Sequence, residues 1–203
     1  MNIFTVITFS YLLGSIPFGF ILTKFFVKED VRKIGSGNIG ATNVLRTGNK
    51  LLAFLTLILD LLKGYLPVII TIKYFPDLIQ LSCLLAFLGH LFPIWLKFRG
   101  GKGVATYLGI LFALSVQLSL LFIFTWLVVS LIFRYSSVSS MFSSLTVFVV
   151  TVIKDNALKS IDSNLYMDKN IILILFIFFV LILFTHRQNI SNLKNKTEQK
   201  IKI

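Results

Sequence analysis

Charged side chains are scarce in this 203-residue chain, where Asp, Glu, Lys and Arg together make up only 14% of the residues. A soluble domain usually carries about a quarter charged residues. Four stretches contain no charged residue and a fifth is almost wholly aliphatic or aromatic: Met1–Thr23, Leu78–Leu96, Val104–Phe133, Tyr135–Ile153 and Ile171–Thr185. Because about 20 apolar residues span the hydrocarbon core of a bilayer, the sequence predicts a polytopic integral membrane protein.

Cysteine, histidine and acidic residues are also few. The single cysteine, Cys83, excludes a disulfide framework within one chain and a cysteine metal site. The sequence has no carboxylate cluster, no His-rich motif, no HxxxxD pattern and no GxSxG elbow. It therefore predicts that no metal and no cofactor is used, and it disfavours metal-dependent phosphotransfer and acyl-enzyme chemistry.

The net charge of +12 could indicate nucleic-acid binding, but the cations gather in short segments beside the apolar runs. That distribution is typical of the positive-inside bias of membrane proteins, and of attraction to anionic lipid or an anionic substrate. The first apolar run lacks a basic leading region and a small-residue cleavage site, so we expect a retained span and not a cleaved signal peptide.

Six hydrophobic blocks can be drawn, at about 2–24, 51–72, 78–96, 104–133, 136–153 and 171–185. The fourth, as one helix, would be about 45 Å long, well beyond a core of about 30 Å. A turn at Ser115-Val116-Gln117 would divide it and give an all-α bundle of seven transmembrane helices. With the N-terminus outside, the basic segments 25–50 and 97–103, Arg134 and the C-terminus then all face the cytoplasm.

No linker or repeat marks a domain boundary. The sequence predicts one membrane-embedded domain over 1–203, with a basic cytoplasmic tail at 186–203.

The segment Gly35–Arg46 is the strongest local signal. Its glycines permit positive φ and close backbone approach, and its polar side chains suit a phosphate group, with Arg46 able to bind bidentately. The candidate ligand-binding residues are Ser36, Gly37, Asn38, Gly40, Thr42, Asn43 and Arg46. The alternative is an ordinary interfacial turn with asparagine caps.

A second glycine-rich loop comprises Gly100, Gly101, Lys102 and Gly103 and leads directly into an apolar run. Amides at a helix start together with a mobile lysine can bind an anion, although the spacing is not that of a Walker loop. The alternative is a short positive-inside turn. Both loops are expected on the same side of the membrane, which favours one shared site.

Other polar residues lie within or at the ends of the apolar blocks. His90 could be a general base, a substrate donor or a satisfied packing group. Asp60 and Lys63, three residues apart, are most simply a structural ion pair that supports the adjacent loop. The segment Gly14–Gly19 combines small residues with a proline and predicts a kinked packing device.

Two further sets of donors are expected at the cytoplasmic ends of spans. Ser137 and Ser140 follow Arg134, so they could contact a phosphate or serve only close helix packing. His186 and Asn189 end the last span, where they could contribute to a site or act as an interfacial anchor.

Several of these motifs, in this order and over nearly the full chain, resemble the bacterial acyl-phosphate:glycerol-3-phosphate acyltransferase (PlsY) family. The matching segments are Gly14–Gly19, Asp30–Arg32, Gly35–Asn43, Asp60–Gly64, Gly89–Pro93, Phe98–Thr106, Arg134-Tyr135, Ser137, Ser140, His186-Arg187 and Asn189-Ile190.

The resemblance implies a seven-span enzyme of the bacterial inner membrane with a cytoplasm-facing active site. It would transfer a fatty acyl group from acyl-phosphate to the 1-hydroxyl of glycerol 3-phosphate, giving lysophosphatidate and phosphate for phospholipid synthesis. Its partners would be these two substrates and membrane lipid, with no nucleic acid and no required protein partner.

Such a reaction agrees with the residue chemistry, because an acyl-phosphate is already activated and needs no enzyme nucleophile or metal. Positioning and oxyanion stabilisation can supply the rate. We expect Ser36, Asn38, Thr42, Asn43 and the 100–103 loop to hold the acyl-phosphate. Arg46, Lys102, Ser140, His186 and Asn189 would orient glycerol 3-phosphate. His90, His186 or the leaving phosphate would take the proton; Lys102 and Asn43 complete the predicted catalytic set.

Two other classes of function use similar donors. An organic-phosphate transporter should show inverted repeats and interrupted helices at the membrane midplane, which the sequence does not display. A non-catalytic lipid-phosphate-binding membrane protein would explain the basic face without requiring two glycine loops.

Overall fold

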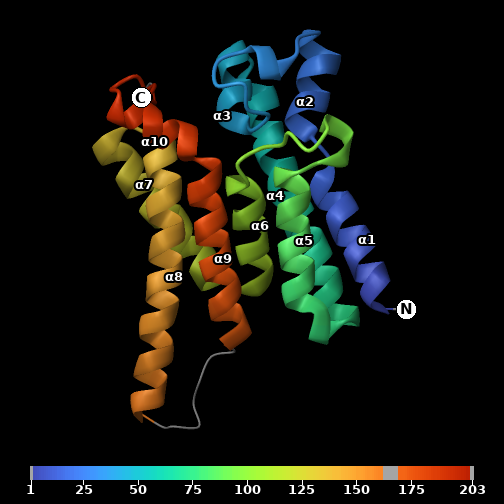
Figure 1. Ribbon diagram of the computed structural model, residues 1–203, viewed down its shortest axis with the longest axis vertical. Helices are drawn as coiled ribbons and strands as arrows, with labels where there is room; N and C mark the ends of the chain where they lie inside the picture. The colour runs from blue at the N-terminus through green and yellow to red at the C-terminus, as the bar shows by residue number, and fades with distance from the viewer. Residues whose placement is uncertain (1, 162–168, 202–203) are drawn as a thin grey trace. The chain divides into compact units, whose positions relative to one another are not determined.

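The computed structural model describes residues 2–161 and 169–201. In these ranges all regular secondary structure is helical, as the sequence predicts, and no strand is present. The chain forms two compact units, Met1–Ser115 and Val116–Ile203, which are described separately below. Figure 1 shows the helices of both units.

The first unit holds six α-helices joined by short 3₁₀ turns. They are α1 (Asn2–Ser15), α2 (Phe18–Leu22), α3 (Ala41–Val44), α4 (Lys50–Tyr74), α5 (Ile79–Leu91) and α6 (Val104–Leu114). A π-helical turn, Thr23–Val27, continues α2, and 3₁₀ turns lie at Val31–Lys33, Leu45–Thr47, Pro76–Leu78 and Ile94–Leu96. The second unit holds α7 (Val116–Phe133), α8 (Ser136–Ile161), α9 (Lys169–Thr185) and α10 (Arg187–Lys194).

Among the described residues, four helical segments are long and apolar enough to cross a membrane: Lys50–Tyr74, Pro76–Leu96, Val116–Phe133 and Ser136–Ser160. Two bent pairs, Asn2–Ser15 with Phe18–Val27 and Asn170–Thr185 with Arg187–Lys194, raise this to six if each pair is one span. The 11-residue α6 is apolar but shorter. The chain is therefore an integral membrane protein by length and composition of its helices.

The predicted break in the long block 104–133 is present at Ser115. Its backbone is extended (φ −164°, ψ 118°), and its N–H donates to the Leu111 carbonyl to close α6. A new helix then starts at Val116.

Small residues let the helices of the first unit approach closely. A β-carbon at Gly14 would overlap the Ala86 carbonyl on α5, and one at Gly89 would lie 2.6 Å from the Tyr11 carbonyl oxygen on α1. In the same way Gly64 of α4 lies against the backbone of Thr106 on α6. These contacts pair α1 with α5 and α4 with α6, as small residues do in membrane helices.

The chain bends by 40° between α1 and the helical segment that starts at Phe18, which confirms the kink predicted for Gly14–Gly19. Pro17 has no N–H to continue the helical ladder. Lys63 donates to the Ile16 carbonyl at the bend (2.7 Å) and pairs with Asp60 (2.8 Å); both charged side chains are buried. The predicted Asp60–Lys63 ion pair is thus present, and it anchors the bend.

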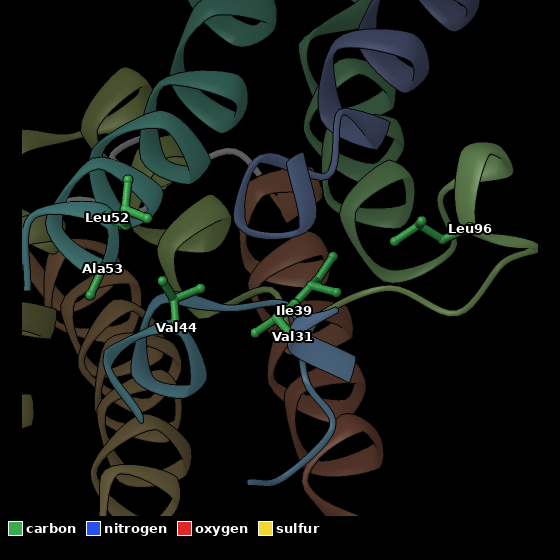
Figure 2. Packing of buried hydrophobic residues seen from close by; sticks show 6 residues of the cluster. All are labelled: Val31, Ile39, Val44, Leu52, Ala53 and Leu96. Carbon is green, nitrogen blue, oxygen red and sulfur yellow. The ribbon is translucent and has the colours of Figure 1, made fainter. Parts of the chain in front are cut away.

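A buried apolar cluster lies under the connecting segments of the first unit (Figure 2). It joins the segment before α3, α3 itself, the start of α4 and the turn after α5 through Val31, Ile39, Val44, Leu52, Ala53 and Leu96. The segments that carry the two glycine-rich loops therefore share one core.

Candidate functional site

The first glycine-rich loop requires backbone conformations that favour glycine. Gly35 and Gly37 both have positive φ, +51° and +69°. A β-carbon at Gly35 would lie 2.6 Å from Asn43 Oδ1 and 2.6 Å from Arg46 Cδ. The loop thus folds tightly over these two side chains.

Asn43 is the centre of this loop. It lies on α3 with a side chain that is almost fully buried. Its amide nitrogen donates to three loop carbonyls, those of Val31 (2.9 Å), Ile34 (3.0 Å) and Asn38 (2.7 Å). Its Oδ1 accepts from Ser36 N (3.0 Å) and Arg46 Nη1 (3.3 Å). The structure therefore places Asn43 inside the loop, with both ends of the amide engaged by it.

The other predicted residues of this loop lie nearer the surface. Ser36, Gly37, Thr42 and Arg46 are exposed, and Asn38 and Gly40 are half-buried. Asn38 Oδ1 accepts from Gly40 N (2.8 Å), which fixes the turn that enters α3. Asn43 is thus the internal support of a loop whose Ser36 and Thr42 are exposed and whose Arg46 guanidinium is bound to Asn43 on one side.

An ion pair precedes the loop. Asp30 caps the Val31–Lys33 turn by accepting from Arg32 N (3.0 Å), and it also accepts from Arg32 Nε (2.9 Å) and Nη2 (2.7 Å). The hydrogen bonds from Arg32 lower the pKa of Asp30 from 3.8 to about 2. The carboxylate is therefore charged at neutral pH and fixes the entry to the loop.

The second glycine-rich loop is held by the end of α5. Gly101 N donates to the His90 carbonyl (3.1 Å) and Gly100 N to the Leu91 carbonyl (3.0 Å). The intervening turn is anchored to α1, because Trp95 Nε1 donates to Ser15 Oγ (2.8 Å) and Tyr11 Oη to the Phe92 carbonyl (2.8 Å).

Gly103 has a φ of +85° and precedes α6, so the loop ends directly at a helix N-terminus. Lys102, between Gly101 and Gly103, is half-buried. The prediction that this loop leads directly into a helix is confirmed, whereas the Gly100 and Gly101 amides are engaged by α5 carbonyls.

His90 lies directly behind this loop. A β-carbon at Gly101 would overlap His90 Nε2. The ring is buried, and its Nδ1 lies 3.9 Å from Asp60 Oδ1. Among the described residues Nδ1 has no hydrogen-bond partner. His90 therefore supports the Gly101 backbone from the bundle side, next to the Asp60–Lys63 pair.

In the second unit, the two predicted serines occupy the first turns of α8 and both are buried. Ser140 Oγ donates to the Ser136 carbonyl (2.8 Å) and accepts from Trp126 Nε1 (3.2 Å). Ser137 Oγ donates to Glu198 Oε1 (2.8 Å).

His186 and Asn189 lie at the junction of α9 and α10, both buried. His186 Nδ1 contacts the Ile182 carbonyl oxygen at 2.8 Å. Because a carbonyl can only accept, this contact assigns the proton of a neutral ring to Nδ1 and leaves Nε2 as the acceptor. Asn189 Nδ2 donates to Glu198 Oε1 (2.7 Å).

The structure thus assembles the predicted residues into two groups. In the first unit His90 contacts the Gly100–Gly103 loop, and the core under the Gly35–Arg46 loop includes Leu96 of the turn that leads to this second loop. The second unit joins Ser137 and Asn189 through Glu198. The sequence analysis did not predict a role for Glu198. The feature that could have indicated it is that Glu198 is the one acidic side chain in the basic tail 186–203.

No group of three or more His, Cys, Asp or Glu side chains that could hold a metal ion occurs within residues 2–161 and 169–201. The polar side chains of these loops carry hydroxyls, carboxamides, a guanidinium and an ammonium, a set of groups that suits an anion.

Comparison with known proteins extends over nearly the whole chain. The glycerol-3-phosphate acyltransferase family profile matches residues 4–196. Glycerol-3-phosphate acyltransferase of Pelagibacter ubique (strain HTCC1062) is 55% identical over 194 residues, covering 96% of this chain and 95% of that protein. The enzyme of that name from Wolbachia sp. subsp. Brugia malayi (strain TRS) is 44% identical, covering 98% of this chain and 99% of its relative.

The fold agrees with solved structures as well. A crystal structure of PlsY (YgiH), an integral membrane glycerol 3-phosphate acyltransferase, in its glycerol 3-phosphate form superposes with a TM-score of 0.88 at 34% identity. It covers 100% of this chain and 96% of the other. The lysophosphatidic acid form gives a TM-score of 0.86 at 34% identity, with coverages of 98% and 95%.

Proposed function

The chain belongs to the glycerol-3-phosphate acyltransferase family, and we propose that it acylates the 1-hydroxyl of glycerol 3-phosphate with acyl-phosphate as the donor. The products would be lysophosphatidate and inorganic phosphate. The observation that carries this proposal is the match over 96% of the chain to a named acyltransferase, with both glycine-rich loops inside the matched region. The forms of the structural relative, with glycerol 3-phosphate and with lysophosphatidic acid, support the same acceptor and product.

We assign the acyl-phosphate to the two loops of the first unit. Ser36, Asn38 and Thr42 would contribute donors from the first loop, and the Gly103 amide would contribute at the start of α6. The Gly100 and Gly101 amides donate to α5 carbonyls, so these two residues would act by shaping the second loop. Asn43 would act by holding the first loop in shape, since its amide is engaged by the loop itself.

The residues for glycerol 3-phosphate follow from the family resemblance. In the first unit Arg46 and Lys102 would neutralise a phosphate. In the second unit the resemblance assigns Ser140, His186 and Asn189 to this substrate, with Ser137 as a further substrate-binding residue. The 1-hydroxyl then attacks the acyl carbonyl carbon, a C–O bond forms, and the bond from that carbon to the phosphate oxygen breaks.

The hydroxyl proton must leave as the new ester forms. His186 is a candidate acceptor, because its Nδ1 contact with Ile182 leaves Nε2 as the basic nitrogen. His90 and the departing phosphate are the other candidates. Donors aimed at the developing oxyanion would contribute several kcal/mol, about 3–4 for one well-placed donor.

We place the protein in the bacterial inner membrane as one acyltransferase domain over 1–203, with seven spans. The short helix α6 and the two bent pairs would complete the four long spans. The N-terminus would then lie outside, and the glycine loops and the basic segment 186–203 would face the cytoplasm.

The test is an assay of purified protein with palmitoyl-phosphate and glycerol 3-phosphate, in which phosphate release and lysophosphatidate are both measured. Equal amounts of the two products are expected without added metal and without acyl-CoA. Lys102→Ala and Asn43→Ala should lose turnover while remaining folded in detergent. Phosphate counterflow without acyl transfer would instead indicate a transporter, and wild-type rates in both variants would overturn the site.

A further inference from the structure

An open pocket lies in the first unit, where the π-helical turn after α2 meets the start of α4. It has a volume of about 740 Å³ and is lined by Phe26, Val27, Thr47, Gly48, Asn49 and Lys50. Phe26 and Val27 belong to the π-helical turn, a feature that is frequent at functional sites. None of the six lining residues is acidic, and the acyl-transfer assignment uses none of them.

Two side chains of this pocket can donate to an anion. Asn49 caps α4 through Oδ1, which accepts from Leu52 N (3.0 Å), so Nδ2 is the part of its amide that remains for a ligand. Lys50 is exposed, and the ion pairs found within residues 2–161 and 169–201 do not include it. The Thr47 hydroxyl is not a third donor, because it donates to the Val44 carbonyl (2.8 Å). An ammonium beside a carboxamide suits a single phosphate group.

The length of α4 places these two donors at the level of lipid headgroups. The helix has 25 residues and is therefore about 37 Å long, whereas the hydrocarbon core of a bilayer is about 30 Å thick. Lys50 is its first residue and Asn49 is its N-cap, so both side chains lie at the end of the span. A lysine in this position keeps its ammonium in the polar interface.

The same face of α4 is apolar below the pocket. Phe54 and Leu57 follow Lys50 by four and seven residues, a spacing that puts all three on one face of the helix. Phe54 is 58% exposed and Leu57 40% exposed, and the neighbouring Leu51 is 65% exposed. A cationic pocket thus continues into an apolar surface that is long enough to contact a hydrocarbon chain.

We propose that this pocket binds the phosphate of an anionic phospholipid from the leaflet at this end of α4. Lys50 Nζ and Asn49 Nδ2 donate to the phosphate oxygens, and an acyl chain lies along Phe54 and Leu57. A free phosphate shares the headgroup chemistry but gains nothing from the apolar face, which is why the ligand is a lipid. The inference goes beyond the proposed function and does not depend on acyl transfer.

Photo-crosslinking tests where such a lipid binds. The probe is phosphatidylglycerol with a diazirine on its headgroup, present at a low mole fraction in phosphatidylcholine nanodiscs that hold the full chain. We expect crosslinks within residues 25–28 and 47–50, and we expect unlabelled phosphatidylglycerol to suppress them. Equal labelling of these residues by a phosphatidylcholine probe would refute selection for an anionic headgroup. Suppression by inorganic phosphate as effective as that by phosphatidylglycerol would refute a lipid site.

The variant Lys50→Gln removes the cation and keeps a polar side chain on an exposed position. Since one lysine near an anionic lipid surface contributes about a fivefold gain in affinity, we expect crosslinking within 25–28 to fall about fivefold. Lys73→Gln is the matched control, because it makes the same charge change on an exposed residue in the last turn of the same helix. It should leave crosslinking at the pocket unchanged. Crosslinking in Lys50→Gln equal to that of the wild type would overturn the proposal.

Discussion

At Asn43, three backbone carbonyls, one backbone amide and a guanidinium meet a single buried side chain. The Asn43 side chain supplies hydrogen-bond partners for backbone groups of the loop, namely the Ser36 amide and the Val31, Ile34 and Asn38 carbonyls. Leaving one buried polar group without a partner costs about 1–3 kcal/mol. The shape of the loop therefore depends on the amide donor as well as on the size of the residue.

Asn43→Asp keeps the size of this residue and removes the donor. A carboxylate facing the carbonyls of Val31, Ile34 and Asn38 is repelled, so we expect turnover to fall more than tenfold and the 31–46 loop to open. Faster tryptic cleavage at Lys33 and Arg46 measures the opening. A loop as resistant to trypsin as the wild type would show that the amide does not organise it.

Gly101 and His90 form a second residue-scale unit. We expect Gly101→Ala to lower kcat/KM for palmitoyl-phosphate at least a hundredfold, because its methyl group overlaps His90 Nε2. His90→Ala removes the obstacle, so the double variant should regain at least tenfold over Gly101→Ala. His90→Ala alone must retain activity for this comparison, because His90 is also a candidate proton acceptor. With that control satisfied, a double variant no better than Gly101→Ala would show that the ring does not act through Gly101. His90→Asn, tested alongside, separates the loss of ring volume from the loss of a polar group.

Asp30 offers a titration with a defined sign. Its pKa of about 2, below the usual 3.8, means that the pairing with Arg32 contributes to stability above pH 4 and is lost as the pH falls toward 2. In Arg32→Ala the pKa of Asp30 should return toward 3.8, as measured by carboxyl NMR of protein in micelles. A pKa that stays near 2 would contradict this origin of the shift.

At the scale of helices, the first unit depends on contacts between backbones. Gly14 of α1 lies against the Ala86 carbonyl, and Gly109 of α6 lies against the Leu61 carbonyl on α4. Even one added methyl group must displace a helix at these points, and overpacking of this kind costs about 1–3 kcal/mol.

Gly14→Ala should therefore lower the thermal midpoint in detergent by several degrees. Leu12→Ala is the control on the same helix, because Leu12 is 40% exposed and its truncation should change stability much less. Equal thermal midpoints for the two variants would mean that the added methyl group between α1 and α5 does not destabilise the protein.

Helix boundaries were predictable where length or backbone chemistry decided them. The 104–133 block is too long for one span, and the chain breaks at Ser115; Pro17 removes an N–H, and the helix bends there. The direction of the Asn43 side chain was not predictable, since the same residue type caps a helix, binds a ligand or organises a loop. Nor was Glu198, because its partner Ser137 is 61 residues away.

At the scale of the whole molecule, the seven-span proposal predicts on which side of the membrane each loop between two spans lies. The native Cys83 is buried and can be replaced, so Cys83→Ser provides a background for single cysteines. Lys33→Cys and Lys194→Cys should react with an impermeant maleimide only in inverted vesicles, whereas Asp77→Cys should react in intact cells. Labelling of all three from one side would refute the topology.

The close seams in the first unit also restrict where a fatty chain can go. At Gly14, Gly64 and Gly109 the opposing backbones leave less room than one methylene group requires. Hydrocarbon therefore cannot slide between α1 and α5 or between α4 and α6 without separating them. Selectivity for acyl-chain length must therefore depend on other surfaces of the protein. Substitutions at the α1–α5 and α4–α6 contacts should lower the free energy of unfolding before they change the chain length of the product.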